Sequence, residues 1–211
     1  MGTDTSRRDS AWAAGDDLTA KARIRNAAFE LHAAQGEANT TLREVAQAAG
    51  VTHGLVVHHF GTKDSLRRAV QQHMLDLLRQ ALDDVPTEGS AAQIGQARDA
   101  RVARMYAAHP PFLPYLRRAL IDPSHLDAEL LDLLAEFTLA QVRDLRDAGI
   151  ASSDAPEHVQ ALAIVLRELG PRLLEPVVQR LWAHLTQSAG PPPEVEIRLR
   201  PRAVEAPTQA Q

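Results

Sequence analysis

Apolar residues recur at helical spacing along most of this chain. Ile24, Ala28 and Leu31 show the pattern first, because they fall on one face of a helix. The same periodicity predicts helices over residues 19–35, 41–48, 52–58, 63–82, 91–108, 115–121, 124–147, 156–169 and 172–187. Gly170 and Pro171 are expected to separate the last two. No long run of alternating β-branched residues indicates a sheet, so the pattern predicts an all-α protein.

Residues 41–66 are predicted to form two short helices joined by a tight turn and the start of a third. Thr41 and Glu44 have the spacing of a capping box, in which side chains satisfy unpaired backbone N–H groups at a helix start. Gly50 permits the left-handed conformation that ends a helix. Thr52 then caps a second helix, which Gly61 ends. Two short helices around such a turn predict a helix-turn-helix motif, whose second helix enters the DNA major groove.

The run T-x-R-E-V-A-x-x-A-G-V-T-x-G, followed by H-H-F-G-T-K-D-S-L, resembles the DNA-binding region of the TetR (tetracycline repressor) family of bacterial regulators. The resemblance covers residues 19–66 and continues more weakly to residue 82. It implies an N-terminal helix-turn-helix head and a C-terminal helical domain for ligand binding and dimerisation. It also implies that the helix over residues 63–82 links the two and transmits ligand binding to the DNA-reading helices.

The starts of the two motif helices are candidate DNA contacts. Thr41 and Arg43 lie where backbone N–H groups and the helix dipole attract phosphate. Thr52, His53 and Gly54 begin the helix expected to enter the groove. By the resemblance, His53 replaces a Lys or Arg, and a neutral imidazole can still pair with a base edge while adding less salt-dependent affinity. Gly54 allows a close backbone approach to DNA.

Four further residues complete the predicted DNA-binding set. Val57 is expected to face outward, within reach of a thymine methyl group. His58 stands where the family often carries a phosphate-contacting tyrosine, and His59 matches the family's histidine. Lys63 corresponds to a lysine that reaches a phosphate in the family. A metal site at His53, His58 and His59 is disfavoured, because the spacing of five and the different helix faces do not converge.

Composition narrows the alternatives. The net charge is −4, but residues 19–80 hold eight Lys/Arg and five Asp/Glu, whereas residues 81–211 hold 13 and 18, so the motif lies in the basic part. The chain has no cysteine, which excludes disulfides and thiolate metal sites. No apolar run is long enough to span a membrane, and no signal peptide is recognisable, so we expect a cytoplasmic protein. Nothing resembles a nucleophile–base pair or a phosphate loop, and neither an enzyme nor a cofactor is predicted.

The resemblance implies two further partners. A small-molecule effector would occupy a pocket among the C-terminal helices, where one candidate set of residues is apolar or aromatic: Met105, Tyr106, Phe112, Tyr115, Leu134 and Phe137. Because one recognition helix reads few base pairs, such proteins bind DNA as two-fold dimers. A second copy of the chain would pair through residues 156–187, which are predicted to form an apolar antiparallel pair of helices. The alternative for residues 156–187 is a hairpin within the core of one monomer.

These observations predict a two-domain transcription regulator. The expected parts are a disordered arm (1–18), a helix-turn-helix domain with its linking helix (19–82), an effector and dimerisation domain (91–187) and a Pro-rich disordered tail (188–211). We expect a dimeric repressor that an effector releases from a palindromic operator. Two alternatives remain: a helical small-molecule-binding protein whose head has lost DNA binding, as the changes at His53 and His58 suggest, and an activator with the same architecture.

Overall fold

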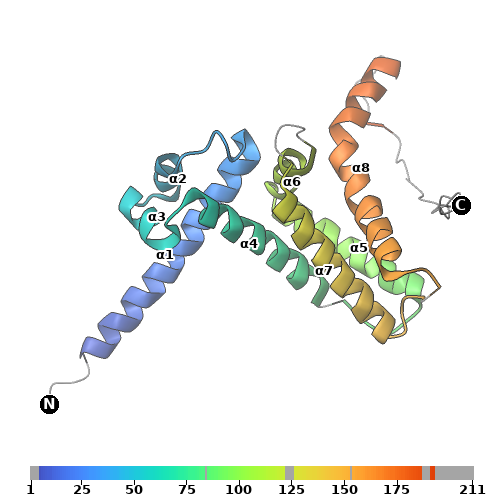
Figure 1. The fold of residues 1–211 in the computed structure, drawn as a ribbon, viewed down its shortest axis with the longest axis horizontal. Coiled ribbons are helices and arrows are strands. Elements are labelled where there is room, and N and C mark those ends of the chain that lie inside the picture. The colour runs from blue at the N-terminus through green and yellow to red at the C-terminus, as the bar shows by residue number, and fades with distance from the viewer. Residues whose placement is uncertain (1–4, 84, 122–125, 153, 187–190, 193–211) are drawn as a thin grey trace, which may run out of the picture. The chain divides into compact units, whose positions relative to one another are not determined.

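The computed structural model describes residues 5–83, 85–121, 126–152, 154–186 and 191–192, with side chains from Thr19 onward. Within these ranges the chain forms eight helices and no strand, which confirms the all-α prediction (Figure 1). The helices are α1 Thr5–Gln35, α2 Leu42–Ala49, α3 His53–Phe60, α4 Lys63–Asp83, α5 Ala91–Ala108, α6 Phe112–Ile121, α7 Ala128–Asp147 and α8 Glu157–Thr186. None of the described helices is long and apolar enough to cross a bilayer.

The chain divides into two compact units, Met1–Leu131 and Asp132–Gln211. The first holds α1 to α6 and the first turn of α7, and the second holds the rest of α7 and α8. The predicted division into residues 19–82 and 91–187 stays a prediction, because this partition follows compactness and not function. Most of the predicted tail over residues 188–211 lies outside the described part of the chain.

Helix α1 is the central element of the first unit. Ile24 and Ala28 are fully buried on one face, as the periodicity predicted. This helix packs against α2, α3, α4 and α6, and Figure 1 shows α2 and α3 beside α1 and the start of α4. The helix begins at Thr5, earlier than the predicted start at residue 19, so helix replaces most of the expected arm. The alanines at 11, 13 and 14 favour this extension, since alanine has the highest helix propensity.

Helix α8 corrects the prediction at Gly170 and Pro171. The helix runs without interruption from Glu157 to Thr186 and contains both Pro171 and Pro176, so residues 156–187 are not an antiparallel pair. A proline removes one backbone donor and pushes against the preceding turn. The donor that Pro171 removes would meet the Arg167 carbonyl, and the guanidinium of Arg172 donates to the neighbouring Glu168 carbonyl. Two separate helices were predicted because Gly and Pro both disfavour a helix interior.

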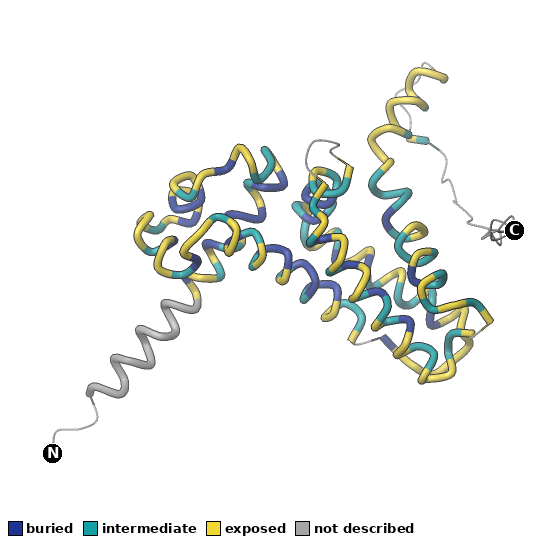
Figure 2. The backbone as a smooth tube through the Cα atoms, in the orientation of Figure 1, coloured by how far each residue is buried: buried dark blue, intermediate teal, exposed yellow. Residues whose placement is uncertain are grey.

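In the second unit, polar contacts connect the end of α7 with the start of α8. Arg143 Nε lies 3.0 Å from Glu157 Oε2, and Arg146 Nε donates to Gln160 Oε1 at 3.0 Å. Helix α8 exposes large apolar side chains, and Figure 2 marks exposed segments along this helix. These exposed residues are Leu162, Leu166, Leu174, Val177, Leu181 and Leu185.

Candidate nucleic-acid interface

The first motif helix, α2, begins and ends as its sequence predicted. The Thr41 hydroxyl accepts from the Glu44 backbone N–H at 3.2 Å, and the Thr41 N–H donates to Glu44 Oε2 at 2.7 Å, which completes the capping box. The Thr41 backbone N–H and hydroxyl both donate to Glu44 Oε2 and lower the pKa of Glu44, since they favour its charged form. Gly50 adopts φ 63° and ψ 40°, and its N–H bonds the carbonyls of Ala46 and Gln47. The turn after α2 is therefore fixed by backbone geometry.

The recognition helix, α3, buries one face and exposes the other. Thr52 caps it by accepting from the Leu55 N–H at 3.3 Å. Val56 and Phe60 are buried, whereas Val57 on the opposite face is 41% exposed. The remaining residues at the exposed start and outer face of α3 are Thr52, His53, Gly54 and His58. The motif thus presents the side chains that were selected as base-reading candidates, while its apolar side is held in the core.

Arg23 connects α1 to the turn between the two motif helices, a role that sequence patterns do not predict. Its Nε and Nη2 donate to the Ala49 carbonyl at 3.2 and 2.8 Å, and Nη2 also reaches the Gly50 carbonyl at 3.0 Å. These carbonyls belong to the end of α2, where intrahelical donors run out. Arg23 therefore ties the helix-turn-helix motif to α1 and sets where the start of α3 lies.

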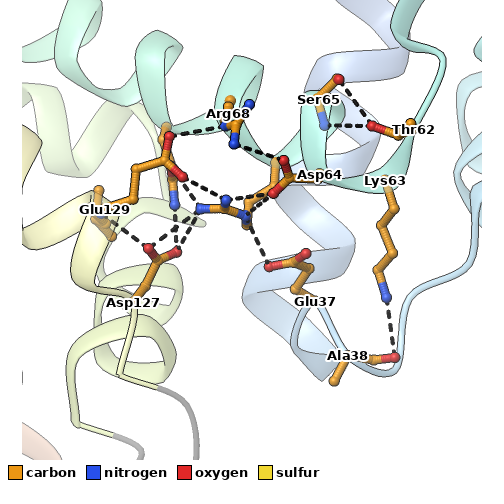
Figure 3. Close-up of polar contacts among 12 residues, drawn as sticks. Glu37, Ala38, Thr62, Lys63, Asp64, Ser65, Arg68, Asp127 and Glu129 are labelled. Atoms are coloured by element: carbon orange, nitrogen blue, oxygen red, sulfur yellow. Dashed lines mark hydrogen bonds and ion pairs between the residues drawn. The ribbon is translucent and has the colours of Figure 1, made fainter.

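The residues predicted to contact phosphate differ in whether they already make hydrogen bonds within the chain. Arg43 is exposed on α2. Lys63, half-buried at the start of α4, donates from Nζ to the Ala38 carbonyl at 3.2 Å, as Figure 3 shows. An ammonium has three donors, so this bond leaves Lys63 able to meet a phosphate. Thr62 caps α4 by accepting from the Ser65 N–H at 3.1 Å, as expected.

The histidines of α3 do not converge on a common centre. The rings of His58 and His59 are 5.4 Å apart and tilted edge to face, and His59 also lies 6.2 Å from the ring of Phe60. Through the described ranges, no group of three or more His, Cys, Asp or Glu side chains is arranged to hold a metal ion. His59 is half-buried, whereas His53 and His58 are exposed, which makes those two the accessible imidazoles of this helix.

A cluster of charged side chains surrounds Arg67 on α4, and it too was missed from the sequence. The Arg67 side chain is only 13% exposed and meets four carboxylates. The distances are 2.6 Å to Asp64, 2.7 Å to Glu129, 3.2 Å to Asp127 and 3.7 Å to Glu37. Figure 3 shows these acids converging from α4, from the loop after α1 and from the start of α7.

The pKa values in this Arg67 cluster follow its hydrogen bonds and burial. Hydrogen bonds from Arg67 lower the pKa of Asp64 and of Glu129. Burial raises the pKa of Glu37, although Arg67 opposes that shift. Burial also lowers the pKa of Arg67, but its bonds to Asp64 and Glu129 outweigh this, and the net pKa is raised. The cluster therefore holds a permanently charged guanidinium that fixes α4 against the two neighbouring segments.

The predicted effector-binding residues lie in both units. Met105, Phe112 and Tyr115 are buried in the first unit, and Tyr106 is half-buried there. The rings of Tyr106 and Phe112 are 5.3 Å apart, and Phe29 of α1 lies 5.8 Å from Tyr115. These distances are those of packed aromatic pairs. In the second unit, Leu134 is buried and Phe137 is half-buried. A role for these residues in ligand binding stays a prediction.

Comparison with known proteins gives independent information. The family model described as bacterial regulatory proteins of the tetR family matches residues 24–70, which include α2, α3 and the turn that Arg23 holds. The chain is 35% identical over 154 residues to the HTH-type transcriptional repressor Rv3405c of Mycobacterium tuberculosis, covering 72% of this chain and 74% of that protein. It is 32% identical over 136 residues to the regulatory protein RaaS of the same species, covering 64% of this chain and 58% of RaaS.

Solved structures resemble the fold. A structure described as a gamma-butyrolactone receptor (ArpA-like protein) superposes with a TM-score of 0.56 at 22% identity, covering 82% of this chain and 88% of that one. CprB of Streptomyces coelicolor, solved in complex with its biological operator sequence, gives a TM-score of 0.54 at 23% identity, covering 81% and 88%. At these identities the likeness concerns the arrangement of helices alone.

Proposed function

This chain belongs to the TetR family of bacterial transcription regulators, and from that premise we propose that it is a dimeric repressor which a small-molecule effector releases from a palindromic DNA operator. The observation that carries the proposal is the exposure of the start of α3, with Val57 outward while Val56 and Phe60 fix the opposite face. The inserted helix would read base edges through Thr52 and His53. Backbone contacts would come from the start of α2 and from Lys63, and such contacts position a protein on DNA without reading sequence.

Dimerisation is supported by the exposed apolar side chains of α8. Leu162, Val177 and Leu181 are each more than half exposed, and large apolar side chains gathered along one helix mark an interaction surface. We place the homodimer contact within residues 156–187, now as one continuous helix from each copy. Two-fold symmetry would then present two α3 helices to the two half-sites of a palindrome.

Release by an effector would follow from linkage. We assign DNA binding to residues 19–82 and effector binding to residues 91–187, among the six residues predicted above. An effector that binds better to the conformation with badly spaced recognition helices shifts the dimer away from DNA by that difference in affinity. A regulator of this kind acts where the bacterial chromosome lies, which is the cytoplasm.

The test is selection of bound sequences from a random duplex pool, with light scattering on the same sample. A two-fold symmetric motif bound by a particle of dimer mass is expected. His53→Ala should relax sequence preference at one position in each half-site, with a loss of about 1–3 kcal/mol there. Gln96→Ala, at an exposed residue of α5 outside the proposed dimer contact, is the control and should leave the motif unchanged.

Two outcomes would contradict parts of this proposal. A well-folded dimer that enriches no sequence at low salt would contradict the repressor reading of the unliganded form and favour a protein whose head has lost DNA binding. Transcription in vitro from a promoter that carries the selected operator separates the other alternative. Added protein should lower the transcript yield, and a rise would identify an activator.

A further inference from the structure

A pocket of about 330 Å³ lies in the first unit, apart from the helix-turn-helix surface. Its walls come from the end of α1, the loop that follows α1, α6 and Asp127. A volume near the lower end of the range for small-molecule sites suits a compact ligand. The pocket has polar and charged side chains on several walls, which distinguishes it from a simple packing defect in an apolar core.

His32 on α1 is the wall residue that the fold itself does not explain. The side chain is only 2% exposed, yet neither ring nitrogen has a hydrogen-bond partner within the described part of the chain. Buried side-chain nitrogens nearly always have a hydrogen-bond partner, so His32 is an exception among the described residues. Burial, helped by the charges of Lys63 and Arg67, lowers the pKa of His32 to about 4, so the ring is neutral at pH 7 with one N–H and one acceptor nitrogen. A buried donor without a partner destabilises a fold, whereas an apolar ring would not.

The electrostatic potential at this ring favours an anion. Lys63 and Arg67 both act on His32 as positive charges. Arg118 of α6 adds a guanidinium to the pocket wall, with Nε donating to the Ala33 carbonyl at 2.9 Å and Nη2 to the Ala34 carbonyl. Its third nitrogen, Nη1, lies 3.9 Å from where a Cβ on Gly36 would stand, at the pocket wall.

The two acidic wall residues are already engaged. Asp127 lies 3.2 Å from Arg67 and also accepts from the Gln71 amide and the Leu130 backbone N–H. Glu37 lies 3.7 Å from Arg67. Both acids pair with Arg67, which they share with Asp64 and Glu129, and the wall side chains that offer N–H donors to a ligand are His32 and Arg118.

We propose that this pocket binds a small carboxylic acid as its anion, with the carboxylate accepting from the His32 ring N–H and from Arg118 Nη1. The rest of the acid would occupy the remaining space beside Ala119. Because the pocket lies between the end of α1 and α6, a bound acid would also contact both sides of the Arg118 bridge that joins these helices. Tyr115 of α6 lines this pocket and also belongs to the predicted effector set, so the acid site is defined by the two donors outside that set, His32 and Arg118.

The test is calorimetric titration of the full chain at pH 7 with acetate, butyrate and benzoate, and with acetamide, butyramide and benzamide as neutral counterparts. At least one acid is expected to bind at least tenfold more tightly than its amide. His32→Phe should weaken that binding at least tenfold while raising the urea midpoint, because it removes the unpaired polar atoms and keeps a flat ring of similar size. Ala119→Leu should also abolish binding by filling the pocket, whereas Ala103→Leu, at an exposed alanine of α5, should not.

Three results would overturn the proposal. The first is that none of the three acids binds the wild-type chain. The second is that acids and amides bind equally. The third is an acid affinity unchanged in both His32→Phe and Ala119→Leu, which would place the acid elsewhere, including the C-terminal effector pocket. Circular dichroism of both variants confirms that they are folded, and selection of DNA by wild-type protein is scored separately, so failure of the acid site does not bear on repressor function.

Discussion

Replacing Arg67 by methionine tests whether its charged cluster stabilises the first unit. Arg67 and Asp127 are 13% and 16% exposed, so Arg67→Met leaves a poorly solvated carboxylate without its cation. Removal of one partner from a buried ion pair costs about 3–5 kcal/mol. Asp127 keeps its bonds from Gln71 and the Leu130 N–H, which places the loss near the lower limit, about 3 kcal/mol. The pairs with Asp64 and Glu129 are screened by solvent and receive no share of this figure.

Urea unfolding followed by far-UV circular dichroism measures the effect of Arg67→Met. With a slope of about 3 kcal/mol per molar urea, the transition of the first unit should move down by about 1 M. Arg68→Met is the matched control, since Arg68 pairs with the same Asp64 and Glu129 but is 59% exposed, and only a small shift is expected. Equal midpoints for the two variants would refute the argument that burial of the Arg67–Asp127 pair sets its contribution.

The pH dependence supplies a second readout for the same variant. The lowered pKa values of Asp64 and Glu129 contribute stability that is present above their ordinary values and is lost as the pH falls through the lowered ones. The contribution of Glu37 to stability has the opposite pH dependence, because its raised pKa favours the folded state at low pH. Arg67→Met removes the first contribution, so its stability should fall less steeply than that of wild type between about pH 5 and pH 3. A fall at least as steep as in wild type would contradict this assignment.

Three further predictions concern the motif and its support. Thr41→Ala removes the capping box and should lower stability by about 1 kcal/mol in the same urea assay, and no change would mean that water replaces the cap fully. Gly50→Ala should lower the free energy of unfolding by about 1–2 kcal/mol, because the φ of Gly50 is 63°. Gly95→Ala, inside α5 with open space around a new Cβ, should raise it by about 0.5–1 kcal/mol. A loss of stability in both variants would show that φ is not the cause. Arg23→Met frees the Ala49 carbonyl and should weaken operator binding in a mobility-shift assay more than it lowers helicity, and intact binding would remove Arg23 from the positioning of α3.

The helix-turn-helix was predictable because its determinants are local. Thr41, Gly50 and Thr52 act on backbone groups within a few residues, and the structure confirms each cap. The support around the motif was not predictable in this way. Arg23 meets a carbonyl 26 residues away, and Arg118 meets one 85 residues away. Arginines at such distances look like ordinary surface charges until the fold brings their partners together.

Local rules also account for the errors at the two ends of the chain. Gly170 and Pro171 are strong breakers when only the backbone is considered, yet α8 continues past them. At the other end, turn-favouring residues such as Asp4 and Gly15 suggested an arm, and helix nevertheless extends to Thr5. His32 departs from the rule that buried polar groups are hydrogen-bonded, since neither ring nitrogen has a partner in the part of the chain that the structure describes.

The use of Arg23 and Arg67 within the fold affects how such a protein would search a chromosome. Cations that neutralise phosphates hold a protein on any DNA sequence and let it slide there, and these two are instead bound to carbonyls and carboxylates of their own chain. A head with fewer phosphate-binding cations leaves random DNA quickly and returns to solution between encounters. Most of its residence time at an operator would then come from base-edge contacts and shape, so its search would proceed by many short visits with little sliding between them.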